Sequence, residues 1–302
     1  MRIHFDEVRN NKIKSWLLMF LFVILISLLG FVIGVIWGSA LFGFSIAALF
    51  SLIYTLIVFF SGDSMILSMT GAKEVSKQEY PYLFHTVEGL AIAANVPKPK
   101  AYVIDDSALN AFATGRDPKH ASITVTTGLL KKLNRQESEG VVAHEMSHIK
   151  NYDIRVMMLA AVLVGITTLL SDFLLRSLLY GGHRRDSRSS RGGGQAMFIL
   201  MIIGIVLAIL SPIIGELIRL AISRKREFTA DANAAILTRY PKGLADALKK
   251  IKDDPDPLVD KANKATAHLF ISTPFRKTKG LVTNLFATHP PIDERIKRLE
   301  DM

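Results

Sequence analysis

The 302-residue chain contains no cysteine. This absence excludes disulfide bridges, thiolate nucleophiles and cysteine-based zinc or iron–sulfur sites, so histidines and carboxylates are the strong metal ligands that remain. The sequence also lacks a basic patch interleaved with aromatic residues and any fingerprint of a nucleic-acid-binding fold. The excess of 37 Lys and Arg over 27 Asp and Glu therefore does not predict a nucleic-acid partner.

What the sequence does have is long uncharged apolar runs, so membrane topology explains the basic excess better. Residues 16–36 and 40–60 are each long enough to cross a bilayer as a helix. Trp37, Gly38 and Ser39 leave room only for a tight turn between the two runs, which predicts a transmembrane hairpin. The alternative for the first run is a cleaved signal peptide, but the run is too long and a second one follows directly.

Two further apolar runs, residues 156–175 and 196–214, predict a second hairpin, although both carry or adjoin charged residues. The Gly-, Ser- and Arg-rich segment between them, residues 181–195, is predicted to be a flexible basic loop. The sequence leaves open whether these two runs cross the membrane fully or embed partway. The chain then divides into residues 1–62, an N-terminal segment with the first hairpin; residues 63–155, a polar block; residues 156–222, the second hairpin; and residues 223–302, a helical C-terminal block.

The two polar blocks are predicted to form one α+β domain with a small sheet. Residues 101–104 and 122–126 have the composition or alternation of strands. Asn134 and Glu137 have the spacing of a capping box and predict the start of a helix that runs through residue 148. The expected fold is therefore a mainly α integral membrane protein with four apolar helices in two hairpins and this additional domain.

The predicted helix carries the sequence His144-Glu145-Met146-Ser147-His148, an H-E-x-x-H arrangement. Residues at positions i and i+4 project from one face of a helix, so the two imidazoles can bind a single zinc ion. Glu145 then lies beside the open coordination position, where it can take a proton from an attacking water and pass it to a leaving amine. The pattern predicts a zinc-dependent hydrolase.

A catalytic zinc ion needs a third protein ligand, and the best candidate is Glu227. Asp231 lies four residues later, so a ligand and a carboxylate that orients a zinc-bound imidazole would share one helical face. The alternative is a surface helix with salt-bridging acids. Glu216 is a rival carboxylate, but it lies within the fourth apolar run. Asp153, just past the second histidine, either supports the site or caps a helix.

These residues resemble the HtpX family of membrane-bound zinc metalloendopeptidases, and the resemblance covers essentially the whole chain. It implies a cytosolic, gluzincin-like peptidase domain with one Zn²⁺ per chain, held by His144, His148 and Glu227, with Glu145 as general base and acid. It also implies turnover of damaged membrane proteins, as part of stress response and protein quality control in the bacterial inner membrane, and kinship with CAAX prenyl proteases. Three further segments match the family, at residues 110–115, 223–231 and 288–295.

A peptidase must hold its substrate extended, usually by adding it to an exposed strand edge. Residues 110–115 are the candidate edge, and the alternative is a buried turn in which Asn110 forms local hydrogen bonds. His289 is a candidate donor to the oxyanion of the tetrahedral intermediate, or else a cap of the helix that the next two prolines begin. The expected partners are membrane-protein or unfolded polypeptide substrates and the lipid bilayer, and the sequence does not decide the oligomeric state.

The predicted ligands also constrain the topology. His148 and Glu227 must meet at one metal ion, so the chain between them crosses the membrane an even number of times. The first hairpin also crosses twice, which places both termini and the active site on one side. The Lys and Arg residues before Trp16 identify that side as the cytoplasm. The arginines of the 181–195 loop would then lie outside, against the same tendency.

Two other functions remain as alternatives to a zinc endopeptidase that cuts misfolded or damaged membrane proteins near the membrane surface. A non-catalytic scaffold or transporter would favour a closed site with four protein ligands, or ionisable residues in the first two spans, and neither is found. A protease that processes prenylated peptides would need a lipid-sized chamber, for which four spans are few.

Overall fold

The computed structural model describes residues 2–165, 201, 204, 224–255, 266, 269–271 and 290–302. The predicted loop at 181–195, Glu216 and His289 lie outside the described residues, as does most of the predicted second hairpin.

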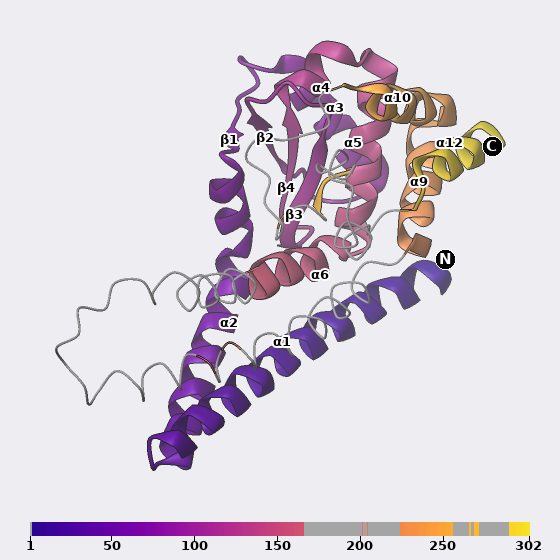
Figure 1. Ribbon diagram of the computed structural model, residues 1–302. Coiled ribbons are helices and arrows are strands. Elements are labelled where there is room, and N and C mark those ends of the chain that lie inside the picture. The colour runs from indigo at the N-terminus through magenta and orange to yellow at the C-terminus, as the bar shows by residue number, and fades with distance from the viewer. Residues whose placement is uncertain are drawn as a thin grey trace.

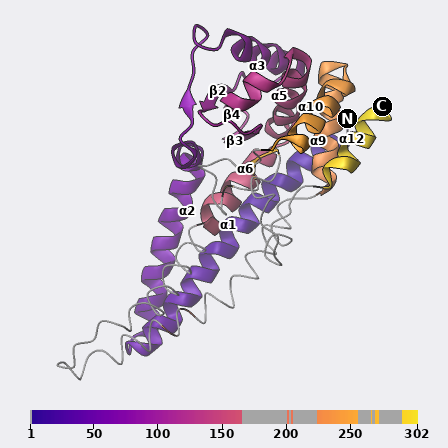
Figure 2. The same cartoon turned by 45° about the horizontal axis from the view of Figure 1, so that its top comes forward.

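The first hairpin consists of α1 (Arg2–Ile36) and α2 (Ala40–Thr70), joined by a turn at residues 37–39. The two helices lie together near the turn, where they project away from the rest of the molecule, and they diverge toward their other ends (Figures 1 and 2). Both contain a stretch long and apolar enough to cross a membrane, and large apolar side chains such as Phe20 and Leu41 are exposed on them. Among the described residues, α1 and α2 are the two helices that are long and apolar enough to cross a membrane, and they agree with the predicted hairpin.

The two helices approach each other closely at glycines. A Cβ atom added to Gly43 would clash with the backbone of Gly30 and Gly34 on α1. One added to Gly30 would clash in turn with Gly43 and with the side chain of Ala47. Small residues at a helix crossing are typical of packing between membrane helices, where close backbone contact replaces the hydrophobic effect.

Both helices are longer than a bilayer is thick. The 35 residues of α1 correspond to about 52 Å at 1.5 Å per residue, whereas a bilayer core is about 30 Å thick. The polar N-terminal part of α1 therefore extends beyond the apolar run, and α2 continues past Phe60 to Thr70. The N-terminus of α1 lies near α9 and the C-terminus, at the end of the hairpin opposite the turn (Figure 1).

A four-stranded mixed sheet follows the hairpin, in agreement with the prediction of a small sheet. Its strands are β1 (Lys73–Glu74), β2 (Lys100–Ile104), β3 (Ala111–Asp117) and β4 (His120–Thr126), in the order β1-β2-β4-β3. The central pair β2 and β4 is parallel, and the outer strands are antiparallel to their neighbours. This order places β3 at the edge of the sheet among the described residues.

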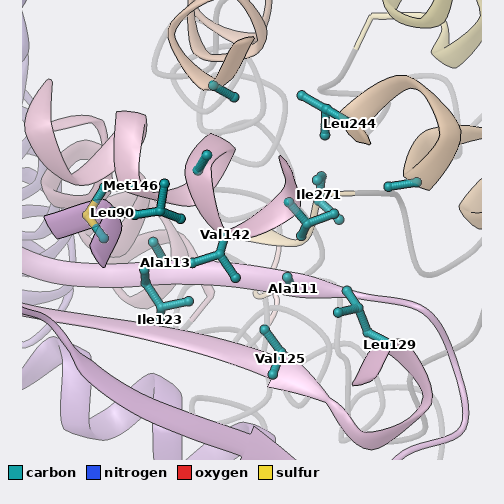
Figure 3. Packing of buried hydrophobic residues seen from close by; sticks show 14 of the residues in the cluster. Leu90, Ala111, Ala113, Ile123, Val125, Leu129, Val142, Met146, Leu244 and Ile271 are labelled. Atoms are coloured by element: carbon teal, nitrogen blue, oxygen red, sulfur yellow. The ribbon is translucent and has the colours of Figure 1, made fainter. Parts of the chain in front are cut away.

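Helices pack on the sheet and bring the polar blocks together. α5 (Arg135–Lys150) begins with the predicted capping box: Asn134 Oδ1 accepts from the Glu137 N–H at 3.0 Å, and Glu137 Oε2 accepts from the Asn134 N–H at 2.8 Å. Val142 and Met146 of α5 face Ala113 and Ile123 on the sheet (Figure 3). The other helices are α3 (Pro81–Ala94), α4 (Thr127–Lys132), α6 (Asp153–Leu159) with a π-helical continuation (Ala160–Val164), α9 (Arg224–Thr238), α10 (Pro241–Asp253) and α12 (Ile292–Glu300).

Candidate metal centre

His144 and His148 project from the same face of α5, as their spacing requires. Their Nε2 atoms are 3.2 Å apart and both side chains are buried. Each ring places its other nitrogen, Nδ1, against a carboxylate: His144 contacts Asp231 at 2.9 Å and His148 contacts Asp153 at 3.0 Å. A neutral imidazole that donates its Nδ1–H to a carboxylate keeps the lone pair on Nε2, so in their neutral form both rings would present that lone pair to the same point.

The carboxylate of Glu227 reaches the same point from α9. Its two oxygens lie 3.7 Å from His144 Nε2 and 3.6 Å from His148 Nε2. Glu227 and Asp231 are one helical turn apart, so one face of α9 supplies the third donor, a carboxylate, and the carboxylate that contacts His144. The side chains of His144, His148 and Glu227 together form a possible metal site among the described residues.

These residues fit a divalent metal ion in spacing and in charge. Tetrahedral ligands about 2.0–2.1 Å from zinc are about 3.3 Å from one another, close to the three separations above. Four buried carboxylates belong to this cluster, from Glu145, Asp153, Glu227 and Asp231, and those of Asp153 and Asp231 lie behind the imidazoles. Two guanidinium groups of the described residues contact them, from Arg226 and Arg295. With all four carboxylates ionised and both imidazoles neutral, these described groups carry two negative charges in excess. A dication would balance this buried charge, which is otherwise costly.

Glu145 lies between the two histidines in sequence and faces β3. Its carboxylate accepts a hydrogen bond from the backbone N–H of Ala113, and its side chain is buried. Burial raises the pKa of Glu145 to about 7; the charge of Glu227 adds to this increase, while His148 and the Ala113 hydrogen bond oppose it. A carboxylic group of this kind can both take up and release a proton near neutral pH.

Arg295 on α12 is a member of the site that the sequence analysis did not single out. Its side chain is fully buried, and it donates from Nε and Nη2 to the two oxygens of Asp231 at 2.9 and 2.7 Å. Burial would raise the pKa of Asp231, but Arg295 and the hydrogen bond to His144 outweigh it and lower that pKa to about 2. Asp231 is therefore ionised and held in place for His144. In the sequence, the one indication of a role for Arg295 was that it belongs to segment 288–295, which resembles the family.

Asp153 supports the site, which the sequence left undecided. It is the first residue of α6, and its Oδ1 accepts hydrogen bonds from Arg226 Nη1 at 3.2 Å and from Asn11 Nδ2 at 2.7 Å. Asn11 belongs to α1 and was not identified from the sequence. A single asparagine in a basic N-terminal segment has no sequence pattern that would predict its burial.

The candidate substrate edge lies next to Glu145 but is not open. Asn110 precedes β3, and its backbone pairs with Thr126 of β4 through a hydrogen bond of 3.0 Å. Residues 111–115 of β3 are buried, and the carbonyl of Ala111 accepts a hydrogen bond from the N–H of Ile271 at 2.9 Å. The substrate edge therefore stays a prediction, and at Ala111 the backbone carbonyl is already paired with Ile271.

Comparison with known proteins identifies the family. The profile of peptidase family M48 matches residues 77–302. A "Protease HtpX homolog" of Dictyoglomus thermophilum is 46% identical over 298 residues, covering 99% of this chain and 94% of that one. Another from Streptococcus gordonii is 42% identical over 301 residues, covering 99% of both.

A solved structure, that of S. mikatae Ste24p, is 22% identical with a TM-score of 0.48. The match covers 97% of this chain, which spans 66% of the length of that one. His144, His148 and Glu227, which form a possible metal site among the described residues, fit a family of metallopeptidases. The chain therefore belongs to peptidase family M48 and is a membrane-bound metalloendopeptidase.

Proposed function

We propose that this peptidase is a zinc enzyme that hydrolyses misfolded or damaged membrane proteins close to the cytoplasmic surface of a bacterial inner membrane. One observation carries the proposal: two imidazole Nε2 atoms and one carboxylate converge at the spacing of tetrahedral zinc ligands, with Glu145 beside them. Among the described residues the donor set has three members, which leaves a position for water and substrate, as a closed structural site would not.

His144, His148 and Glu227 would hold one zinc ion per chain. When bound, such an ion supplies Lewis acidity that polarises a peptide carbonyl and lowers the pKa of water. Asp231 and Asp153 keep the two imidazoles in the required tautomer through their Nδ1–H groups. Arg295 keeps Asp231 ionised and oriented, and thereby supports His144.

Glu145 would be the general base and then the general acid. It would take a proton from the attacking water and transfer it to the amine that leaves when the peptide bond breaks. Its burial excludes bulk water from this transfer. Asn110 and the following strand β3 would bind the substrate backbone, and His289 would donate to the oxyanion. Because Ile271 covers the carbonyl of Ala111, binding along β3 would require residues 269–271 to move aside at that position.

The hairpin and the basic residues before it support the proposed membrane placement. The basic residues at the start of α1 favour a cytoplasmic N-terminus, and the peptidase part lies at the same end of the hairpin. We propose that the apolar run from residue 156 and the run at 196–214 form a second hairpin, so that four helices span the bilayer. α6 leaves the metal centre only five residues after His148 and leads into the third apolar run. Substrates would therefore be cut near the membrane surface.

The proposal is tested by zinc-dependent cleavage of an unfolded protein by the detergent-purified full chain. Glu145→Gln should lower the cleavage rate on the order of a hundredfold or more while the zinc content stays unchanged, because it removes the general base but no ligand. Glu139→Gln, a change of the same kind two turns earlier on α5, should keep the wild-type rate. Equal rates in wild type and Glu145→Gln would contradict the assigned role. Zinc binding without cleavage in either protein would favour a structural site.

A further inference from the structure

The N-terminal extension of α1 reaches the metal centre through Asn11. This residue lies before the apolar run that begins at Trp16, and its side chain is only 3% exposed. A buried polar side chain is stable only when its hydrogen-bonding groups are paired. The burial of Asn11 therefore requires hydrogen-bond partners for its amide group.

The amide of Asn11 uses its donors and its acceptor. Nδ2 donates to Asp153 Oδ1 at 2.7 Å and to the carbonyl of Asn151 at 2.9 Å. Oδ1 accepts from Arg226 Nη1 at 3.3 Å. Because both N–H groups and the carbonyl oxygen have partners, the amide has one orientation that satisfies them all.

Two of these partners, Asn151 and Arg226, lie on or directly at the end of the helices that carry the metal ligands. Asn151 ends α5, which bears His144 and His148, and Arg226 directly precedes Glu227 on α9. One side chain on the membrane helix therefore contacts both ligand-bearing elements, although 140 and 215 residues separate it from these partners in sequence.

Asp153 connects Asn11 to a ligand. One carboxylate oxygen, Oδ1, accepts from Asn11 and from Arg226, and the other, Oδ2, accepts from His148 Nδ1 at 3.0 Å. Two donors on Oδ1 fix the rotation of the carboxylate, so Oδ2 stays directed at the imidazole. Without the Asn11 amide, Arg226 alone would hold Oδ1.

The turn that carries Asp153 is strained and is also held by α1. Tyr152 adopts φ 62°, in the left-handed region that bulky residues avoid. Lys12 Nζ lies 4.5 Å from the centroid of the Tyr152 ring, next to the bond between Asn11 and Asn151. Two successive residues of α1 therefore hold the turn in the conformation that presents Asp153 to His148.

We propose that Asn11 is a positioning residue for the metal centre: through Asp153 it orients the imidazole of His148, and it thereby couples metal affinity to the docking of membrane helix α1. This inference rests on the metal site proposed above. It predicts that the peptidase part needs the N-terminal extension of α1 to bind its metal ion tightly, in addition to needing the hairpin as a membrane anchor.

The test is the zinc dissociation constant of the detergent-purified full chain, measured by competition with a fluorescent chelator. Asn11→Ala should raise the constant about tenfold, the lower end of the effect expected for partners of metal ligands. The control is Ser15→Ala. Ser15 is buried one turn later on α1, and within the part of the chain that the structure describes its hydroxyl bonds to the Asn11 carbonyl of its own helix. Its constant should stay within about twofold of wild type. At saturating zinc, Asn11→Ala should recover its cleavage rate to within about threefold.

A double-mutant cycle tests the route through Asp153. In the Asp153→Asn background, Asn11→Ala should change zinc affinity by less than about twofold, since the carboxylate that it orients is gone. A full further tenfold loss would overturn the proposal. So would a wild-type zinc constant in Asn11→Ala combined with a lower unfolding midpoint, because Asn11 would then be purely structural.

If Asn11→Ala does not fold, Asn11→Leu replaces it, since leucine has similar volume and favours a helix. Zinc affinity equal to wild type in folded Asn11→Leu would overturn the role of Asn11 and leave the metal site standing. A wild-type chain that binds no zinc would instead overturn the metal site itself, so the two failures can be told apart.

Discussion

At the scale of single residues, the centre consists of buried charges arranged in pairs. Asp231 and Asp153 each bond one imidazole and one guanidinium, from Arg295 and Arg226 respectively. Desolvation makes an isolated buried charge very costly, so each member depends on its partners. The centre is therefore sensitive to changes that remove one charge and leave its partner unpaired.

Arg295→Met should lower the free energy of unfolding by about 3–5 kcal/mol, because it leaves Asp231 buried without its bidentate partner. The measurement is denaturant unfolding of the metal-free chain in detergent, followed by circular dichroism. Arg298→Met is the control, since Arg298 is exposed three residues later on α12 and its pairing with Glu294 is worth about 1 kcal/mol or less. Equal effects of the two changes would contradict the role assigned to Arg295.

Spacing alone predicted part of this site. The separation of His144 from His148, and of Glu227 from Asp231, determines which side chains share a helical face, so a periodic pattern is sufficient. Arg295 and Asn11 have no such pattern. Their importance comes from burial against segments distant in sequence, and an arginine or asparagine in a polar stretch looks the same whether it is buried or exposed.

At the scale of elements, α5 is the helix on which the site depends, and its first turn is stabilised locally. Asn134→Ala removes the side-chain acceptor for the Glu137 N–H and should lower the free energy of unfolding by about 1 kcal/mol. Asn134→Ser should cost only a few tenths of a kcal/mol, because serine also caps well. Zinc affinity should not change in either variant, since His144 lies about 15 Å further along the helix. Loss of zinc affinity in Asn134→Ala would show that the cap also orders the site.

The packing of α1 on α2 gives a second prediction at this scale. Gly43→Leu forces a side chain into the backbone of Gly30 and Gly34 and should destabilise the protein by about 1–3 kcal/mol. Ser45→Leu places the same side chain on the exposed face of α2 and should be nearly neutral. The measurement is thermal unfolding in bicelles, and similar midpoints for both variants would contradict the close packing.

The elements were predicted where local chemistry determines them. The capping box of α5, strands β2 and β4 and the two apolar helices all follow from local sequence. The helical start of α1, from Arg2 to Ser15, was not predicted. Its contacts, such as those of Asn11 with Asp153 and Arg226, join segments that are distant in sequence. The covering of β3 by residues 269–271 also depends on contacts between distant segments.

At the scale of the whole molecule, both termini lie at the end of the hairpin that bears the metal centre (Figure 1). α1 and α2 lead away from that end to the turn at residues 37–39. This arrangement separates the chain into a polar end, which carries the chemistry, and an apolar end that suits a bilayer. Orientation in the membrane then decides which proteins the enzyme can reach.

The absence of cysteine makes this orientation directly measurable, because each introduced cysteine is the only thiol in the chain. Asp6→Cys, Ser39→Cys and Met302→Cys all lie at exposed positions, at the N-terminus, the hairpin turn and the C-terminus. A membrane-impermeant maleimide added to intact spheroplasts should label only Ser39→Cys, and the two others should react after permeabilisation. The reverse pattern would place the active site outside the cytoplasm. Labelling of Asp6→Cys and Met302→Cys from opposite sides would mean that the chain crosses the membrane an odd number of times between them. The proposed topology does not allow this result, because α1 docks beside the metal centre that α5 and α9 share, so both ends of the chain must lie on one side.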